Sequence, residues 1–368
     1  MSRWEELLSP SRPAAATPRA AACAGKSVLV TGGGGFIGAA LAKSILRANS
    51  RQVLLLEHSE ENLYRINLEL EEQFPRRAYR TILGDISDPN LVHEILGKWK
   101  LDVIFHAAAF KHVPLMEENP FAVIRNNALG TRVLAEAAAE HGVPRLVLIS
   151  TDKAVNPRSI MGASKRIAEL TLERLQSSKT QMSSVRFGNV FGSNGSVVPR
   201  FREQIAAGGP VCLTHADARR YFLTPAEAIE LILSVAALAD GNGVFLPELG
   251  EPLGIVDLAK RLIALEARDT AGAIEIRITG LRPGEKLTEE LIADRESPEA
   301  TAEPGLLRVR GEALNRVSFD ASFEQLRKTA VERNLAALLD AVCELVPGYC
   351  PSTTLLGLLS PQEVREKL

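Results

Sequence analysis

A glycine-rich turn between an apolar strand and a helical segment constrains this sequence more than any other feature. Residues 27–30 read Ser-Val-Leu-Val, and the next residues read Thr-Gly-Gly-Gly-Gly-Phe-Ile-Gly. Gly32, Gly35 and Gly38 stand at every third position, and residues 39–48 have helical composition. Such glycines let the backbone approach a pyrophosphate, whose charge then faces the helix N-terminus. The strand before the turn and the helix after it favour dinucleotide binding over a purely conformational turn.

The first half of the chain continues as alternating strands and helices. Short apolar runs predict further strands at residues 51–56, 79–83, 101–105 and 146–149. Strands that alternate with helices form a parallel sheet covered on both faces. We therefore predict an α/β fold, a Rossmann-type doubly wound parallel sheet with a smaller C-terminal α/β substrate-binding domain.

A chain of 368 residues is long enough for about two domains. The expected parts are a flexible N-terminal arm at 1–25, a Rossmann domain at 26–188 that returns near 217–247, a mainly substrate-binding domain at 189–310, and a helical tail at 311–368. Within the tail, Leu335, Leu338, Leu339 and Val342 share one helical face. That spacing predicts packing against the rest of the protein.

Composition excludes several classes of protein. The net charge is -2, with 24% charged and 46% hydrophobic residues, which argues against nucleic-acid binding and against disorder. The four cysteines have neither zinc spacing nor a paired framework, so we expect no metal and a reducing, cytoplasmic setting. No apolar run reaches the length of a membrane span.

Residues at the strand ends are candidates for holding the dinucleotide. Glu57 follows Gly38 by about 20 residues, where an acid accepts hydrogen bonds from ribose hydroxyls and favours NAD over NADP. A solvated loop carboxylate is the alternative, and the neighbouring His58, Ser59 and Arg65 are able to accommodate a 2′-phosphate, so NADP stays open. The expected cofactor contacts are Gly32, Gly35, Phe36, Ile37, Gly38, Glu57, His58, Ser59, Asp85, Ile86, Ala107, Ala108, Ala109, Asn126 and Lys165.

Two of these cofactor candidates have plain structural alternatives. Asp85 either reaches the adenine amino group or caps the following helix, whose start is also predicted by Asp88 and Pro89. Asn126 and its neighbour Asn127 lie on an Ala- and Leu-rich helix, where polar residues usually face solvent.

An acid, a base and two hydroxyls follow the strand at 146–149. Residues 150–153 read Ser-Thr-Asp-Lys, at the sheet edge where ligands collect in open α/β folds. Met161 and Lys165 lie four residues apart in the next helical segment and share one face. The combination indicates proton transfer, against the alternative of an ion pair in a surface loop.

With these motifs, the sequence resembles the UDP-N-acetylglucosamine 4,6-dehydratases of the CapD-type polysaccharide-biosynthesis family, which are extended short-chain dehydrogenases/reductases. The resemblance covers roughly residues 26–350 and is carried by six stretches at 109–117, 150–157, 161–166, 185–190, 195–199 and 280–286. Extended enzymes usually place Tyr-x-x-x-Lys where this chain has Met161 and Lys165. A thioether cannot carry a proton, which excludes alcohol dehydrogenase chemistry through a tyrosine there. Many members of the group also carry Met at this position.

The resemblance implies catalytic roles for Thr151, Asp152, Lys153, Met161 and Lys165. Lys153 is the implied base for the C5 proton, and Asp152 is the implied acid for the departing C6 hydroxyl. Thr151 is assigned to the C4 oxygen, and Lys165 to the nicotinamide ribose. NAD or NADP is expected to stay tightly bound and to be regenerated in each cycle. A lysine base needs a depressed pKa, which we expect from burial and from the charge of Lys165.

The resemblance also implies a diphosphate-sugar site in the second half. Arg220 and Arg282 are expected to bind the diphosphate, since a guanidinium suits it well; a surface ion pair is the alternative for either. The expected substrate contacts are Lys111, Asn189, Val197, Val198, Arg202, Arg220, Arg282 and Glu285.

Two other functions remain open at this point. One is a UDP-sugar epimerase with the same 4-keto intermediate, and the other is a nonenzymatic NAD-binding regulatory protein. Asp152 favours dehydration, because elimination needs an acid at the C6 hydroxyl. Most close members of this group carry a membrane-spanning half before the catalytic half, and we expect none in this chain. We therefore expect it to act in the cytoplasm, as a homo-oligomer, alone or with a membrane-associated partner bound through residues 1–25.

Overall fold

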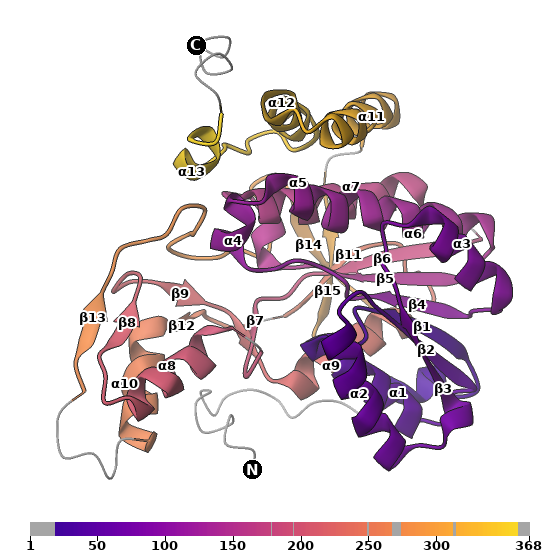
Figure 1. Cartoon of the computed structure of the whole chain (residues 1–368), viewed down its shortest axis with the longest axis horizontal. Coiled ribbons are helices and arrows are strands. Elements are labelled where there is room, and N and C mark those ends of the chain that lie inside the picture. Colours follow the sequence, from indigo (N-terminus) through magenta and orange to yellow (C-terminus); the bar gives the residue numbers. More distant parts are fainter. Residues whose placement is uncertain are drawn as a thin grey trace.

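The computed structural model describes residues 19–359 except 178, 194, 249, 267–273, 312 and 313. The centre of this described part is a nine-stranded sheet (Figure 1). Across the sheet the strands are β14 (Ser297–Ala300), β15 (Leu306–Arg310), β11 (Gly243–Pro247), β6 (Gln181–Val185), β5 (Arg145–Ile149), β4 (Val103–His106), β1 (Ser27–Thr31), β2 (Gln52–Glu57) and β3 (Tyr79–Leu83). The strands from β11 to β3 run parallel; at one edge β15 pairs antiparallel with β11, and β14 pairs antiparallel with β15.

Successive side chains of each strand face opposite sides of the sheet and enter two separate cores. Val28 and Val30 join one core, and Leu29 between them joins the other. The helices over the first face are α1 (Phe36–Arg47), α2 (Glu60–Gln73) and α9 (Pro225–Ala237), and those over the second are α3 (Pro89–Lys98), α6 (Gly130–Glu140) and α7 (Ile160–Leu175). Strands buried on both faces read as continuous apolar runs, which is why the sequence predicts them well.

The predicted Rossmann-type fold is confirmed. The strands predicted in the first half correspond to β1, β2, β3, β4 and β5, with small shifts at their ends. The helix start predicted at Asp88 is also present, because the Asp88 carboxylate accepts from the amides of Asn90 and Leu91. Helix α1 starts at Phe36, earlier than its composition indicates.

The strand order reverses between β1 and its two neighbours. β1 pairs with β2 on one side and with β4 on the other, so the chain runs outward from β1 to β3 in one direction and then returns to the other side of β1 as β4. In a doubly wound sheet a crevice opens at the carboxyl ends of the strands at such a point. The glycine turn after β1, residues 107–109 after β4 and residues 150–153 after β5 all follow carboxyl ends at this edge.

Short strands and two helices form a smaller lobe beside the sheet (Figure 1). Its elements are β7 (Asn189–Val190), α8 (Val197–Ala206), β8 (Val211–Leu213), β9 (Arg219–Arg220), β10 (Phe222–Leu223), β12 (Leu253–Gly254), α10 (Ile255–Glu266) and β13 (Ile276–Ile278). The strands pair as β10 with β7, β12 with β9 and β13 with β8. Phe201 of α8 and Leu258 of α10 share an apolar core of their own.

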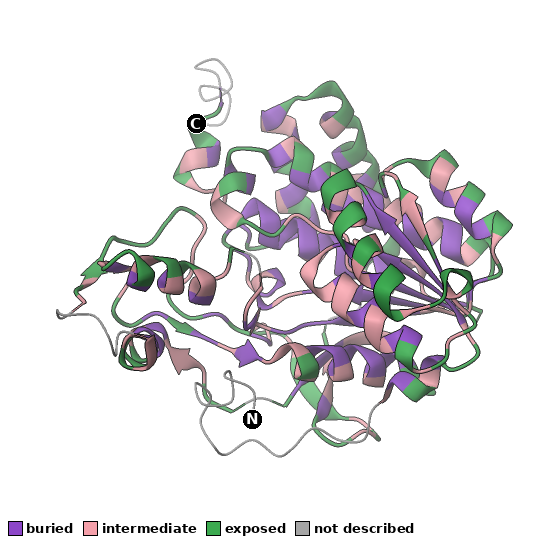
Figure 2. Cartoon of the chain, turned by 60° about the horizontal axis from the view of Figure 1, so that its bottom comes forward, coloured by how far each residue is buried: buried purple, intermediate pink, exposed green. Residues whose placement is uncertain are grey.

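The C-terminal part forms two helices that lie over α7, α11 (Arg316–Glu332) and α12 (Leu335–Leu345) (Figure 1). A left-handed residue, Arg333 with φ of 55°, ends α11. The packing predicted for this tail is confirmed, because the four residues with helical spacing, Leu335, Leu338, Leu339 and Val342, are buried. They share a core with Met161 and Ile167 of α7. Figure 2 shows buried residues along the inner sides of these helices and exposed ones outside.

The last residues of the predicted N-terminal arm are folded onto the sheet layer. Residues 19–23 form a short 3-10 helix in which Ala20 and Cys23 are buried beside α9. The earlier part of the arm, residues 1–18, lies outside the described residues. Within the described ranges, no helix combines the length and apolarity that crossing a membrane requires.

Candidate active site

The glycine turn after β1 is packed tightly against the chain that leaves β4. A Cβ atom on Gly32, which has φ of 65°, would lie 2.7 Å from the amide nitrogen of Ala108. A Cβ on Gly38 would lie 2.1 Å from the carbonyl oxygen of Gly32. Gly35 is the N-cap of α1 and contributes no capping side chain. The turn therefore leaves a helix N-terminus and close backbone for a pyrophosphate, which fits a dinucleotide.

Glu57 is buried at the end of β2 and is tied to the glycine turn. Its Oε2 accepts from the amide of Gly34 at 3.1 Å, and its Oε1 accepts from the amide of Ser59 at 3.0 Å. His58 Nδ1 lies 3.3 Å from Oε1. Burial opposes ionisation of Glu57, but these hydrogen bonds outweigh it and hold its pKa below the ordinary value. The site presents a carboxylate where a dinucleotide ribose is expected.

The two ambiguous cofactor candidates differ in their surroundings. Asp85 does not cap α3, since Asp88 does; its Oδ1 accepts instead from the amide of Ser87. Asn126 donates to Oδ1 of Asn127 at 2.9 Å. Ile86, next to Asp85, is buried.

Asn127 is the deeper member of the asparagine doublet. It is 1% exposed, lies in a π-helical turn at Ile124–Leu129, and bonds both the amide and the carbonyl of Phe110. Its Nδ2 also donates to Ser164 Oγ on α7 at 3.0 Å. Asn127 therefore fixes the chain after β4 to the helix that carries Lys165.

The chain after β5 forms a hydrogen-bonded group of three side chains. Thr151 Oγ1 lies 2.8 Å from Asp152 Oδ1, and Lys153 Nζ lies 2.9 Å from the same oxygen. Asp152 is fully buried, and its Oδ2 has no hydrogen-bond partner within the described part of the chain. The structure thus brings together the acid, the base and the hydroxyl predicted from the sequence.

Helix α7 begins directly under this group. A Cβ on Gly162 would lie 2.2 Å from the carbonyl oxygen of Lys153, so the helix approaches as closely as its backbone allows. Met161 is 2% exposed and packs in the apolar core, and Lys165 is 3% exposed. Burial lowers the pKa of Lys165 to about 8, although the charge of Glu169 opposes the shift.

The charges around Lys153 differ from the sequence-based expectation. Burial alone lowers the pKa of Lys153, but the negative charges of Asp152 and Glu289 outweigh burial, and the pKa lies above its ordinary value. Glu289 Oε1 is 3.5 Å from Lys153 Nζ. The expected depressed pKa is therefore wrong for this structure, because the chain supplies a second carboxylate that the sequence pattern did not reveal.

Two further lysines, Lys111 and Lys286, lie near Thr151, Asp152 and Lys153. Burial, followed by the charge of Lys153, lowers the pKa of Lys111, so Lys111 lies on the same side of the site. Lys286 Nζ donates to the carbonyl oxygen of Val155 at 2.7 Å, which ties the segment after Arg282 to the chain after Lys153.

The two arginines predicted to bind a diphosphate are placed differently. Arg220 is 6% exposed, and its guanidinium donates to the carbonyl oxygens of residues 219, 286 and 287. Arg282 is about half exposed, with its side chain near Glu285. Glu285 accepts from the Arg282 amide at 3.2 Å and lies 3.3 Å from Arg220. Arg282 is thus the arginine with donors available to a ligand, while Arg220 anchors the segment that carries Glu289.

The remaining substrate candidates are dispersed. Val198 is fully buried in the core of the smaller lobe, and Arg202 pairs with Glu266 of α10 at 2.5 Å, so neither is placed beside Asp152. Val197 begins α8 and is partly buried. Asn189 begins β7, and its amide donates to the carbonyl of Tyr221.

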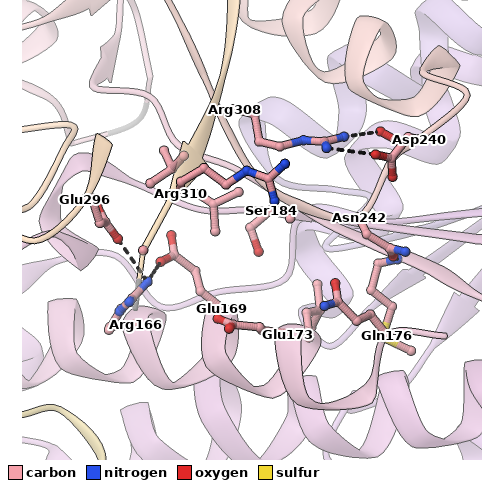
Figure 3. Close-up of a pocket in the computed structure, with 16 residues that line it drawn as sticks. Arg166, Glu169, Glu173, Gln176, Ser184, Asp240, Asn242, Glu296, Arg308 and Arg310 are labelled. Atoms are coloured by element: carbon pink, nitrogen blue, oxygen red, sulfur yellow. Dashed lines mark hydrogen bonds and ion pairs between the residues drawn. The ribbon is translucent and has the colours of Figure 1, made fainter. Parts of the chain in front are cut away.

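A buried ion-pair network lies next to the carboxyl end of β5, where Ser150 donates to Glu169. Glu169 of α7 binds the fully buried Arg186 at 2.7 and 2.8 Å, and Arg186 binds Glu296 at 2.6 Å. A cavity of about 290 Å³ adjoins it, lined by Arg166, Glu169, Glu173, Glu296, Arg308 and others (Figure 3). Figure 3 shows that the side chains of Arg308 and Asp240 are paired at its rim. This cavity is separate from the strand-end group, which includes none of its lining residues.

Sequence reasoning missed three buried residues that organise the site: Asn127, Glu169 and Glu289. Asn127 belongs to a doublet that spacing alone would place on solvent, and the π-helical turn changes its direction. Glu289 comes from a distant loop, and its only signal was that it follows the Arg-Pro-Gly-Glu stretch.

The comparisons with known proteins agree with this fold. A family model described as "Polysaccharide biosynthesis protein" matches residues 28–310. Capsular polysaccharide biosynthesis protein CapD of Staphylococcus aureus is 46% identical over 274 residues, which cover 74% of this chain and 46% of CapD. A Campylobacter jejuni UDP-N-acetylglucosamine 4,6-dehydratase (inverting) is 32% identical over 74% of this chain and 79% of its own length. The chain therefore spans about half the length of CapD and most of the length of the dehydratase.

Solved structures show the same fold. Pen from Bacillus thuringiensis has a TM-score of 0.72 and 28% identity, and covers 83% of this chain and 98% of its own. A dTDP-glucose 4,6-dehydratase from Streptomyces venezuelae, solved with NAD bound, has a TM-score of 0.63 and 23% identity over 72% of this chain and 87% of its own. The chain belongs to the polysaccharide biosynthesis protein family, within the extended short-chain nucleotide-sugar dehydratases and epimerases.

Proposed function

We propose that this chain is an NAD(P)-dependent UDP-N-acetylglucosamine 4,6-dehydratase of glycan precursor synthesis. The observation that carries the proposal is the sharing of Asp152 Oδ1 by Thr151 and Lys153, at 2.8 and 2.9 Å. One carboxyl group is thereby connected to a hydroxyl and to an amine at the carboxyl end of β5. The 32% identity with the C. jejuni dehydratase supports the same substrate.

The residues of the glycine turn fit a dinucleotide, and a bound NAD or NADP would supply reversible acceptance of a hydride. Gly32 and Gly38 leave no room for side chains, Glu57 offers a carboxylate to the ribose, and α7 carries the buried Lys165. An ionised Glu57 repels a 2′-phosphate, which favours NAD. The cofactor stays with the protein through the cycle, because the hydride removed from C4 returns to C6.

Asp152 supports a proton path from the C4 hydroxyl to the C6 hydroxyl. Thr151 passes the C4 hydroxyl proton to Asp152 along their 2.8 Å hydrogen bond when the C4 ketone forms. Asp152, now protonated, gives that proton to the C6 oxygen, which departs as water. The two steps balance, since the proton lost at C4 leaves in the water molecule.

Lys153 removes the C5 proton that the C4 ketone makes acidic and later returns a proton to C5. Met161 occupies the position on α7 where extended short-chain enzymes usually have a tyrosine, and its side chain packs in the apolar core. The acid and base of the reaction are therefore drawn from the chain after β5. A general acid or base at such a position contributes about two to four orders of magnitude in rate.

The experiment incubates the purified protein with UDP-N-acetylglucosamine in deuterated water without added cofactor. Dehydration gives a product lighter by one water that carries deuterium at C5. An isomer of unchanged mass, apart from solvent label, would identify an epimerase, and no change in any UDP-hexose would leave a binding role. The variant Lys153→Ala should keep its bound cofactor and lose dehydration; an active Lys153→Ala protein would disprove the base assignment.

A further inference from the structure

Glu289 places a second carboxylate against the proposed base. Its side chain is 3% exposed, with Oε1 3.5 Å from Lys153 Nζ and 3.9 Å from Arg220 Nε. Oε2 is buried and has no hydrogen-bond partner among the residues that the structure describes. Buried carboxylates are almost always hydrogen-bonded, so a free oxygen beside a reacting lysine requires an explanation.

The loop that carries Glu289 is held firmly in place. Arg220 donates to the carbonyl oxygens of Lys286 and Leu287, and an isolated bridge pairs Arg219 with Thr288. These contacts fix the backbone immediately before Glu289. The approach of Glu289 to Lys153 is therefore built into the fold.

The proposed base begins the cycle with a proton that it must lose. Lys153 faces the carboxylates of Asp152 and Glu289 and the positive charges of Arg220 and Lys111, and the net effect keeps its ammonium charged. Asp152 cannot take this proton, because it is committed to the proton that goes from C4 to C6. Glu289 is the other carboxylate in contact with Lys153 within the described chain.

We propose that Glu289 takes the ammonium proton of Lys153 before C5 is attacked, stores it during elimination, and returns it when C5 is reprotonated. This inference rests on the proposed dehydration. Glu289 acts through Lys153 and is a positioning residue, since it is assigned no contact with the sugar or the cofactor.

The steps balance without an added reactant. An N–H bond of Lys153 breaks and an O–H bond forms on Glu289, which leaves a neutral amine and a neutral carboxyl group. The amine lone pair takes the C5 proton, and the C–H electron pair moves toward the C4 oxygen and then expels the C6 oxygen, which Asp152 protonates. After hydride has returned to C6, Lys153 gives its proton to C5, and Glu289 gives the stored proton back to Lys153.

Substrate binding supplies the reason for the first transfer. A quarter of the Lys153 side chain is exposed in the structure, and a bound sugar would remove water from it. Desolvation disfavours charged forms and so favours the neutral amine and carboxyl pair. Burial and the negative charge of Asp152 already raise the pKa of Glu289. The positive charges of Lys153, Arg220 and Lys286 oppose this rise without cancelling it. The 3.5 Å separation is within the range that tightens when a substrate closes the site.

The test compares Glu289→Gln with Glu290→Gln in otherwise intact protein. Glu290 is the next residue in the chain; it is about half exposed, and it bonds Lys286 at 3.3 Å. Glu290→Gln therefore removes the same charge as Glu289→Gln at a neighbouring position. Three quantities are measured with C5-deuterated UDP-N-acetylglucosamine: the appearance of reduced nicotinamide, the loss of C5 deuterium, and their dependence on pH. Thermal melting and cofactor content confirm that both variants fold.

Glu289→Gln should form reduced nicotinamide in a burst and then stall. Loss of C5 deuterium near neutral pH should fall by about 10²- to 10⁴-fold, with a rate that climbs as pH rises, because Lys153 must now lose its proton to water. Glu290→Gln should behave as wild type, and Glu289→Asp should recover part of the exchange. If Glu289 merely keeps Lys153 charged, its removal lowers the Lys153 pKa. Exchange at or above the wild-type rate would then overturn the proposal.

A substrate-free measurement separates failure of this inference from failure of the proposed function. If wild-type protein leaves UDP-N-acetylglucosamine unchanged, the proposed substrate is wrong. The contact between Glu289 and Lys153, without which no proton can pass between them, is then tested by amine modification of Lys153 across pH, mapped by peptide mass. Its midpoint should fall by about one pH unit or more in Glu289→Gln and stay unchanged in Glu290→Gln. Equal midpoints in wild type and Glu289→Gln would refute the link between the two groups.

Discussion

Ser150 donates its hydroxyl to Glu169 Oε1 at 2.6 Å and thereby connects the residue before Thr151 to a buried ion pair on α7. Glu169 in turn holds the fully buried Arg186, whose other carboxylate partner is Glu296. The strand end that carries Thr151, Asp152 and Lys153 is thus tied to a largely buried charged network.

Glu169→Gln should destabilise the protein by about 3–5 kcal/mol, because Arg186 loses half of its charge compensation while it stays buried. Urea unfolding followed by circular dichroism measures this. Glu173→Gln is the matched control, one turn further along α7 and lining the same cavity. Burial raises the pKa of Glu173, so its replacement should cost little. Equal losses in the two variants would contradict the assigned importance of the Glu169–Arg186 pair.

Acid should weaken the fold through the same residue. Burial opposes ionisation of Glu169, but the charge and hydrogen bonds of Arg186 outweigh it and lower the pKa to about 2 from an ordinary value of 4.5. A depressed carboxyl pKa contributes stability that is present above 4.5 and is lost as pH falls toward 2. The free energy of unfolding of wild type should therefore drop more steeply between these pH values than that of Glu169→Gln. Parallel curves would show that Glu169 is not the group responsible.

Lys165→Met should lose bound nicotinamide cofactor and yet stabilise the cofactor-free protein near neutral pH. The folded-state pKa of about 8 lies below the ordinary 10.5, so below pH 8 the fold carries a costly buried charge. Stability of stripped wild type should rise as pH goes from 8 toward 10.5, and the variant should lack this rise. We expect a gain at neutral pH on the order of 1–3 kcal/mol. Thermal melts of stripped proteins across pH check the sign.

Glu57→Gln should weaken the preference for NAD. The wild-type carboxylate is ionised and buried, and a 2′-phosphate placed beside it meets like charge. We expect the dissociation constant for NADP divided by that for NAD to decrease by about tenfold or more relative to wild type, equivalent to about 1.4 kcal/mol. Binding to stripped protein and chromatography of extracted nucleotide measure it. Glu61→Gln, an exposed neighbour on α2, should leave the ratio unchanged; wild type purified with NADP would reverse the assignment.

Arg282→Ala and Arg220→Ala should differ in kind. Arg282 is about half exposed, so its loss should raise KM for the UDP-sugar by about 10- to 100-fold with little effect on unfolding. Arg220 is buried among backbone carbonyls, so its loss should destabilise the protein and release the loop of Glu289. Steady-state kinetics and melting curves distinguish the two. An unchanged KM in Arg282→Ala would remove Arg282 from the diphosphate site.

The sequence predicted features that are written in short segments. β1 and β5 are continuous apolar runs, and the glycine turn and Thr151-Asp152-Lys153 follow their ends directly, so local pattern located them. The direction of a side chain and the approach of distant segments are set by packing instead. The π-helical turn changes the direction of the Asn127 side chain. Arg202 pairs with Glu266 of α10, and the Arg220 guanidinium donates to backbone carbonyl oxygens. Glu289 reaches Lys153 from a loop that is distant in the sequence. Its negative charge helps to raise the pKa of Lys153, where the sequence had predicted a lowered one.

The position of α11 and α12 over α7 has a consequence for how the protein can be divided. The stretch matched by the family model ends at residue 310, before either helix begins. A fragment trimmed to that stretch would retain every residue assigned to the chemistry. It would also expose the side of α7 that faces α11 and α12, around Met161 and Ile167, which now packs against Leu338 and Leu339. Such a fragment is expected to aggregate through this apolar face, so the smallest independent folding unit extends past the stretch that the family model matches.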